Sequence, residues 1–204
     1  MMAGRGKPKA YHHGDLYESL VKAGTELLIE QGLGGFTLRE CARRAGVSHA
    51  APKNHFASVD ALLAEIAARG FDAFVDALAR AAYEADPQTP DARLKAMGRA
   101  YITFAMTHTA VYSLMFRHNQ PFSASEHLAH AATAGWVQLE TAVEAVLGPK
   151  RTDHTVCAAH VWAVVHGIAS LIIDRRLPPS ANPEAVIMLS LESLPASIRG
   201  LGAP

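Results

Sequence analysis

The chain has 204 residues, of which 50% are hydrophobic, and its 19 Lys and Arg residues balance 19 Asp and Glu residues. That composition suits one sizeable packed domain, or a small domain joined to a larger one, and excludes wholesale disorder. No apolar run approaches the ~18 uncharged residues that a membrane span requires, and the two cysteines, Cys41 and Cys157, do not suggest a disulfide framework. The N-terminus, MMAGRGKPKAYHHG, is basic without an apolar segment behind it, so a cytoplasmic protein without a secretory signal is expected.

Positive charge is mildly concentrated near the N-terminus. Residues 1–60 hold eight Lys and Arg residues against six acidic residues, a balance of +2. Arg5, Lys7 and Lys9 form an acid-free tail, and Arg39, Arg43 and Arg44 surround one predicted turn. On charge alone, a solubilising tail with a solvated helix face remains as good an interpretation as a polyanionic partner.

Hydrophobic periodicity is helical nearly everywhere, which predicts an all-α fold. The first helix is expected over 15–31 and stops at Gly32. The second begins at the N-cap Thr37 and closes at Gly46, a short third begins at Ser48, and a long fourth runs from the N-cap Ser58 to about residue 85. After the breaker DPQTPD (86–91), helices are expected over 91–108, 109–118, 124–147, 152–175 and 183–194, the last limited by Pro195. We therefore place an N-terminal domain at 1–57 and a larger helical domain at 58–204.

Residues 37–56, TLRECARRAGVSHAAPKNHF, have the pattern of a helix-turn-helix. The small Ala42 and Ala45 allow two helices to approach closely, and Gly46 permits a left-handed turn between them. Val47 fills the corner and Ser48 caps the next helix, which in this motif enters the DNA major groove. An ordinary helical corner is the alternative, since all-α proteins contain many glycine turns.

The segment 15–63 resembles the N-terminal domain of the TetR family of transcriptional repressors. The resemblance covers Gly32, Thr37-Leu38-Arg39, Ala42, Ala45-Gly46-Val47-Ser48, His55-Phe56 and Leu62-Leu63. YHHGDL (11–16) and VSHAAP (47–52) are similar to one subgroup, whose C-terminal domain is marked by Trp and His-Gly, as at Trp162, His166 and Gly167. The family resemblance implies a helix-turn-helix domain followed by a helical ligand-binding and dimerisation domain. The implied function is a homodimeric repressor that binds a palindromic operator in double-stranded DNA and is released by a small-molecule effector.

The chain departs from the family pattern where DNA contacts are expected. Lys53 stands where most members have a tyrosine that contacts phosphate, and Val59 stands in place of a common lysine. Lysine can still bind phosphate as a flexible point charge, while Asn54 is suited to reading adenine. The residues expected to contact DNA are Thr37, Arg39, Arg43, Arg44, Ser48, His49, Lys53 and Asn54.

The family resemblance also implies an effector pocket and a dimer interface in the C-terminal domain. Large side chains at helical spacing are the candidates for the pocket, although core packing explains most of them individually. These candidates are Tyr101, Phe104, His108, Tyr112, Met115, Phe116, Trp136 and Trp162. The interface is expected on the helices 152–175 and 183–194, with Ala163, Gly167, Ser170, Val186 and Leu189 as its candidates.

Two other classes of function have weaker support in the sequence. A metal-sensing regulator would use His127 and His130, or His154, Cys157 and His160, but residues six apart on a helix point away from each other. A small helical enzyme would need a site assembled from distant residues, because no nucleophile elbow, phosphate loop or carboxylate pair is evident. We therefore expect a protein that is not an enzyme, without a metal, a cofactor or a membrane partner.

Overall fold

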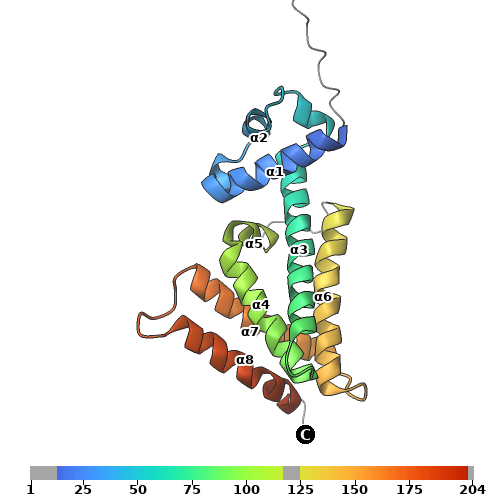
Figure 1. The fold of residues 1–204 in the computed structure, drawn as a ribbon, viewed down its shortest axis with the longest axis vertical. Helices are drawn as coiled ribbons and strands as arrows, with labels where there is room; N and C mark the ends of the chain where they lie inside the picture. The colour runs from blue at the N-terminus through green and yellow to red at the C-terminus, as the bar shows by residue number, and fades with distance from the viewer. Residues whose placement is uncertain (1–12, 117–124, 202–204) are drawn as a thin grey trace, which may run out of the picture. The chain divides into compact units, whose positions relative to one another are not determined.

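The computed structural model describes residues 13–116 and 125–201, and within them the chain is helical, without strands (Figure 1). The predicted all-α fold is therefore confirmed. The basic tail with Arg5, Lys7 and Lys9 lies outside the described residues. In chain order the elements are α1 (His13–Gln31), η1 (Leu33–Gly35), α2 (Leu38–Arg44), η2 (Ala51–Asn54), α3 (Val59–Glu84), α4 (Pro90–Thr107), α5 (Thr109–Met115), α6 (Glu126–Leu147), α7 (His154–Ile173) and α8 (Pro183–Gly200).

The predicted N-cap of α2 and the predicted turn after this helix are present. The Thr37 hydroxyl accepts a hydrogen bond from the backbone N–H of Glu40 at 3.1 Å, which caps α2. Gly46 has φ +69°, so it adopts the left-handed conformation that the sequence predicted. The Val47 N–H reaches the Ala42 carbonyl at 3.0 Å and the Gly46 N–H reaches that of Arg43 at 3.2 Å. These two bonds form a Schellman motif that ends α2.

The expected third helix is shorter and tighter than predicted, and Ser48 is not its side-chain cap. The chain forms turns up to Ala50 and then the short 3-10 helix η2, which has no side-chain cap. Pro52 explains the difference, because it has no N–H to donate and disfavours helical geometry in Ala51. The hydrogen bonds here close over three residues, as from the Ala51 N–H to the Ser48 carbonyl at 3.0 Å.

The chain divides into two compact units, Met1–Ile66 and Ala67–Pro204, within α3 instead of at its start. Leu62 and Ile66 explain why the first turns of α3 belong to the N-terminal unit. Both are buried, and a methyl group added to Gly24 of α1 would lie 3.3 Å from Leu62 and 3.0 Å from Ile66. The glycine thus permits close packing of α1 on α3 in the core of this unit.

In the C-terminal unit, α4 packs against α5, α6, α7 and α8. Its contact with α8 is close at Gly98, where an added Cβ would come 2.5 Å from the Leu191 side chain. Ion pairs flank this contact and tie the exposed edges of the two helices together. They join Lys95 to Glu192 at 2.8 Å, Arg99 to Glu184 at 2.8 Å, and Arg199 to Asp91.

The last helix continues past Pro195, so the prediction that this proline limits it is wrong. A proline inside a helix removes one backbone hydrogen bond. The residues on either side of it, Leu194 and Ile198, are buried in the core of the C-terminal unit, and that burial keeps the chain helical. The predicted start is confirmed, since the Asn182 side chain accepts hydrogen bonds from two backbone N–H groups at 2.9 and 3.2 Å.

The α7 helix is more apolar than we expected from the sequence. Over an 18-residue window its mean hydropathy is 2.0, so by length and composition it could cross a membrane, contrary to the expectation that no segment could. About 33% of that window is buried inside the chain. It packs against α4, α6 and α8, as a core helix of the C-terminal unit does.

Candidate functional site

The residues expected to contact DNA lie on α2, η2 and the turns beside them. The side chains of Thr37, Arg39, Arg43, Ser48, His49, Lys53 and Asn54 are exposed. Arg44 is the exception, because its side chain is only 16% exposed. Within the described residues, Arg39 and Lys53 form no ion pair, so their charges face solvent.

Glu40 holds the two adjacent arginines of α2. Its carboxylate accepts two hydrogen bonds from Arg43, at 2.8 and 2.6 Å, and one from Arg44 at 3.3 Å. These hydrogen bonds lower the pKa of Glu40 to about 2, and those from Arg43 have the largest effect. Arg44 also donates to Glu30 of α1 at 2.7 Å. Arg44 therefore joins α1 to α2, and much of the positive charge predicted for the DNA surface is neutralised within the chain.

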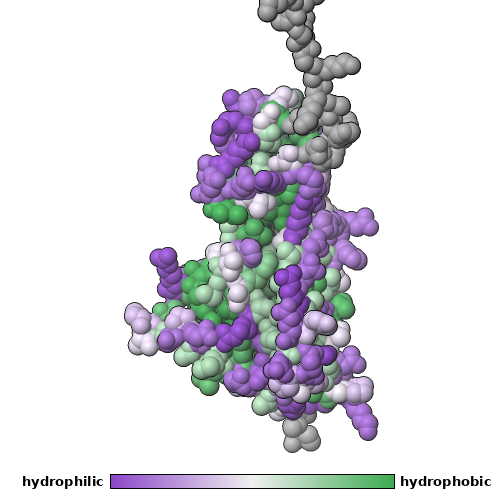
Figure 2. Space-filling view, viewed as in Figure 1, coloured by the Kyte–Doolittle hydropathy of each residue, from purple (hydrophilic) through white to green (hydrophobic). Residues whose placement is uncertain are grey.

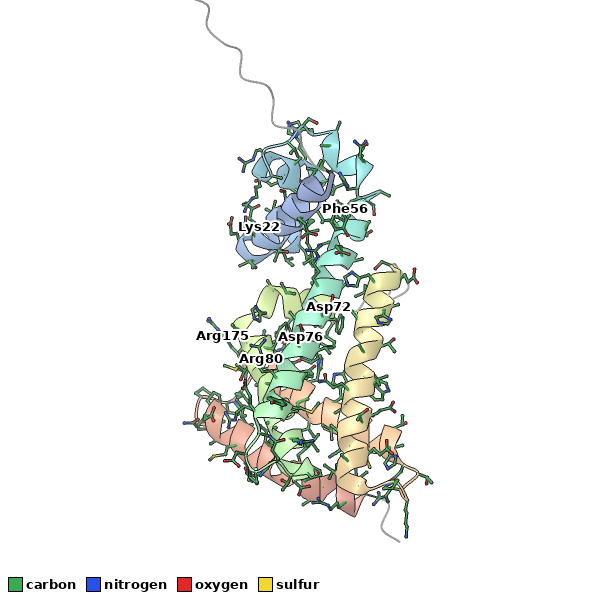
Figure 3. The ribbon with its side chains drawn as sticks, turned by 45° about the vertical axis from the view of Figure 1, so that its right-hand side comes forward. Lys22, Phe56, Asp72, Asp76, Arg80 and Arg175 are labelled. Carbon is green, nitrogen blue, oxygen red and sulfur yellow. The ribbon has the colours of Figure 1, made fainter. Side chains whose placement is uncertain are left out.

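Aromatic packing holds η2 against α1. Pro52 is buried, and its carbonyl accepts the N–H of Phe56 at 2.8 Å. Phe56, labelled in Figure 3, is 3% exposed and stacks on Tyr17 of α1 with ring centroids 4.9 Å apart. Phe56 is thus a core residue. Pro52 and Phe56 anchor the recognition segment, residues 48–56, on either side of Lys53 and Asn54, so these two residues are presented on an anchored turn.

The C-terminal unit contains a partly open cavity of about 520 Å³. Its wall is formed by α3, α4, α6 and α7, together with Phe116 just after α5. The volume falls within the range of pockets for small molecules. The lining residues are Phe71, Phe74, Leu78, Leu94, Met97, Gly98, Tyr101, Phe116, Ala129, Ala132, Thr133, Gly135, Trp136, Leu139, Val161, Trp162 and Val165.

Small side chains on one face of α6 leave this space open. Ala129, Ala132, Thr133 and Trp136 recur at the spacing of a single helical face, and only the last is large. A Cβ added to Gly135 would meet nothing closer than 3.6 Å. The opposite wall belongs to α3, which lies beside α6 (Figure 1) and carries Asp72, Asp76 and Arg80 on its exposed face (Figure 3).

Four of the eight predicted pocket residues line the cavity: Tyr101, Phe116, Trp136 and Trp162. The other four lie elsewhere in the C-terminal unit. Phe104 and Met115 are buried in the core, and Tyr112 is buried behind the wall. His108 is exposed between α4 and α5, with its ring 4.6 Å from that of Phe104. The wall from α3 and the small-residue face of α6 were not predicted from the sequence, although the spacing of small residues on α6 was a usable signal.

A polar network lies at the cavity wall. The Trp162 indole N–H donates to the Tyr101 hydroxyl at 3.3 Å, and this hydroxyl lies 3.1 Å from that of Tyr112. His166 Nδ1 lies 2.9 Å from the Tyr101 hydroxyl and 2.8 Å from that of Tyr112. Burial lowers the pKa of His166 and raises those of both tyrosines, Tyr112 to about 12. All three groups are therefore neutral near pH 7.

The candidate metal ligands are dispersed. His127 pairs with Asp72 at 2.8 Å, His154 with the Gly148 carbonyl at 3.1 Å, and His160 with Ser197 at 3.3 Å. Among the residues that the structure describes, no group of three His, Cys, Asp or Glu side chains is arranged to hold a metal ion.

The predicted interface residues lie on α7 and α8. Ala163 is exposed, Leu189 is 74% exposed, and Gly167, Ser170 and Val186 are partly exposed. A Cβ added to Gly167 would meet no atom within 4 Å. Figure 2 shows apolar surface where Figure 1 draws α7 and α8. Other exposed apolar side chains of these helices are Val156, Leu171 and Met188.

The chain was compared with known families and structures. Residues 20–66 match the family model of bacterial regulatory proteins of the tetR family, and residues 94–194 match that of a tetracyclin repressor-like C-terminal domain. No curated protein matches the chain. A protein with unknown function from Rhodococcus sp. RHA1 is 32% identical over 93% of this chain and 98% of its own, with a TM-score of 0.81.

Two further solved structures share the fold at lower identity. One is a bacterial regulatory protein in the tetR family from Rhodococcus RHA1, 21% identical over 90% of this chain and 96% of its own, with a TM-score of 0.62. The other is AibR in complex with isovaleryl coenzyme A and operator DNA, 19% identical over 86% of this chain and 96% of its own, with a TM-score of 0.60.

The helix-turn-helix unit and the helical unit around a cavity define a DNA-binding regulator of transcription. With both family models matched in order along the sequence, the chain belongs to the TetR family of transcriptional regulators.

Proposed function

We propose that this protein is a cytoplasmic, homodimeric repressor that binds a palindromic operator and is released from it by a small molecule bound in the cavity of the C-terminal unit. The position of α3 in the chain is the main support for this proposal. The helix begins directly after the helix-turn-helix, and its later residues Phe71, Phe74 and Leu78 line the cavity. A ligand that contacts these side chains acts on the same continuous helix that supplies Leu62 and Ile66 to the N-terminal core.

Release requires only a difference in ligand affinity between two conformations. A ligand that prefers the non-binding conformation by ~5.5 kcal/mol would move the equilibrium from about 1:99 to 99:1. Burial of a small apolar molecule in a cavity of about 520 Å³ is compatible with such a preference. AibR, which shares the fold, binds isovaleryl coenzyme A and operator DNA, and this supports the same general scheme for the present chain.

The exposed apolar residues of α7 and α8 support a homodimer. Val156 is 66% exposed, Met188 55% and Leu189 74%. Apolar residues gathered on neighbouring helices indicate an interaction surface. A two-fold dimer would bring two recognition segments to half-sites that are ~34–36 Å apart, which accounts for a palindromic operator.

A metal-sensing regulator is disfavoured, because three of the histidines available to it, His127, His154 and His160, are hydrogen-bonded to other groups. We assign no catalytic activity to the chain.

A fluorescence anisotropy titration tests the proposal, with labelled DNA from the upstream region of the protein's own gene and scrambled DNA as the control. We expect sequence-preferring binding that weakens as salt rises, since released counterions drive association with DNA. Light scattering on the same sample should give the mass of a dimer. Equal affinity for the scrambled DNA, or a chelator-sensitive complex, would refute the repressor proposal.

A further inference from the structure

The cavity presents hydrogen-bond donors in an apolar, uncharged wall. Among its described lining residues, none carries a charged side chain. Hydrogen-bonding side chains come from Tyr101, Thr133, Trp136 and Trp162. The Thr133 hydroxyl already donates to the Ala129 carbonyl at 2.7 Å, which leaves the tyrosine hydroxyl and the two indole N–H groups as possible ligand partners.

The two tryptophans differ in how their donors are used. Trp162 donates to Tyr101 at 3.3 Å. This hydrogen bond is the longest of the polar network and is therefore its weakest. Within the part of the chain that the structure describes, the Trp136 indole N–H has no hydrogen-bond partner in the protein. The two rings meet edge to face with centroids 6.2 Å apart, so both border the same part of the cavity.

The tyrosine hydroxyls cannot take the place of a positive charge. Both hydroxyls lie within hydrogen-bond distance of each other and of the single nitrogen His166 Nδ1, so each already has partners within this network before a ligand arrives. An anionic group would lose hydration in the cavity and would meet no compensating cation among the described lining residues.

We propose that the effector is a neutral, largely apolar molecule with one hydrogen-bond acceptor, such as a ketone, ester or ether oxygen, which is received by the indole N–H groups of Trp136 and Trp162. This inference rests on the proposed function, because it names the chemical class of the molecule that would occupy the same cavity. It sets the cavity apart from a site for a carboxylate or for a coenzyme A thioester, whose phosphates carry several charges.

The test compares three probes that share a chain length: 2-undecanone with a neutral acceptor, 1-undecene with none, and undecanoate with a negative charge. Trp136 and Trp162 are the two tryptophans of the sequence and both line the cavity, so quenching of intrinsic fluorescence reports on this site. At pH 7.5 we expect the full-length protein to bind the ketone at least about ten-fold more tightly than the carboxylate.

Variants then identify the donor. We expect Trp136→Phe or Trp162→Phe to lower the preference for 2-undecanone over 1-undecene by about five-fold, about 1 kcal/mol. Phe74→Leu is the matched control, since it alters the apolar wall without removing a donor. It should weaken both probes alike and leave their ratio unchanged.

Three results would overturn the assignment: no saturable quenching by 2-undecanone, tighter binding of undecanoate or undecanoyl coenzyme A, or an unchanged ratio in both tryptophan variants. Operator binding is measured in parallel by anisotropy. If 2-undecanone binds but leaves the operator complex intact, effector release fails while the ligand class stands. If a charged molecule occupies the cavity and releases the operator, the ligand class fails while the proposed function stands.

Discussion

Glu40→Gln should strengthen operator binding, although it removes an ion pair from the helix-turn-helix. In the free protein the Glu40 carboxylate accepts hydrogen bonds from two guanidinium nitrogens of Arg43, at 2.8 and 2.6 Å, and from one of Arg44. The Arg43 side chain is 65% exposed, so it becomes available to DNA phosphate once the carboxylate is gone. The Thr37 cap is unaffected, because it uses the backbone N–H of Glu40.

The magnitude follows from counterion release. One additional phosphate contact per subunit makes the slope of log affinity against log salt steeper by about 0.9, or about 1.8 for the proposed dimer. Between about 50 and 200 mM salt, that difference lowers the ratio of variant to wild-type affinity by about twelve-fold. We therefore expect a clear advantage of the variant at low salt that shrinks steeply as salt is added.

The measurement is an anisotropy titration at four salt concentrations, with Glu26→Gln as the control. Glu26 lies on α1 in the same unit, and its substitution removes the same charge but frees only Lys22, which is 4.0 Å away and highly exposed. If both variants show the same slope, the ion pair of Glu40 does not limit DNA binding. Because Arg43 and then Arg44 lower the pKa of Glu40 from 4.5 to about 2, the wild-type carboxylate stays ionised down to low pH. The effect should therefore be constant across neutral pH and disappear only as pH falls from 4.5 towards 2.

Arg175 has φ +54° after α7, so Arg175→Gly should stabilise the protein by about 1 kcal/mol in urea unfolding, whereas Arg176→Gly should bring no such gain. In light scattering, Gly167→Arg should yield monomers while Gly200→Arg stays dimeric, although neither glycine has a neighbouring atom within 4 Å of an added Cβ. A dimeric Gly167→Arg variant would exclude this face as the interface. Cys41 is fully buried and burial raises its pKa to about 11, so at pH 8 iodoacetamide should modify it only as fast as the protein unfolds. Rapid modification of the native protein would contradict the packing of α2.

The sequence was most informative where structure depends on neighbouring residues. Thr37 and Ser58 act as the predicted caps, and Gly46 has the predicted left-handed backbone. Each of these features involves a hydrogen bond or a dihedral angle within one turn of chain, so residue type and spacing nearly determine it.

The predictions of a helix that begins at Ser48 and of a helix end at Pro195 were wrong, because the effect of a proline depends on its surroundings. At Pro52 the local effect dominates, and the recognition segment tightens into a 3-10 helix. At Pro195 burial dominates, since the turn that follows supplies Ile198 to the core. A sequence pattern predicts the backbone hydrogen bond that a proline removes, but it does not predict the burial that offsets this loss.

The cavity was only partly predictable for a different reason. Large aromatic residues attract attention as pocket candidates, yet Phe104, Tyr112 and Met115 are packed away from the cavity or behind its wall. The space itself depends on small side chains on α6, where alanines and a glycine face the interior in place of larger residues. Similarly, the charges of Arg43 and Arg44 were evident from the sequence, but their neutralisation by Glu40 and Glu30 depends on side-chain geometry.

The packing of α3 and α5 provides a physical reason for a ligand to affect α3. A Cβ added to Gly70 of α3 would come 2.7 Å from Val111 and 2.9 Å from Met115, so α5 packs closely against this turn. Phe71, the next residue, lines the cavity and also packs edge to face against Phe116. A ligand that moves the Phe71 ring therefore acts where α3 has no spare volume, and close-packed interiors respond by shifting the backbone. In the proposed repressor, that shift of α3 is the step that separates ligand-bound from DNA-bound conformations.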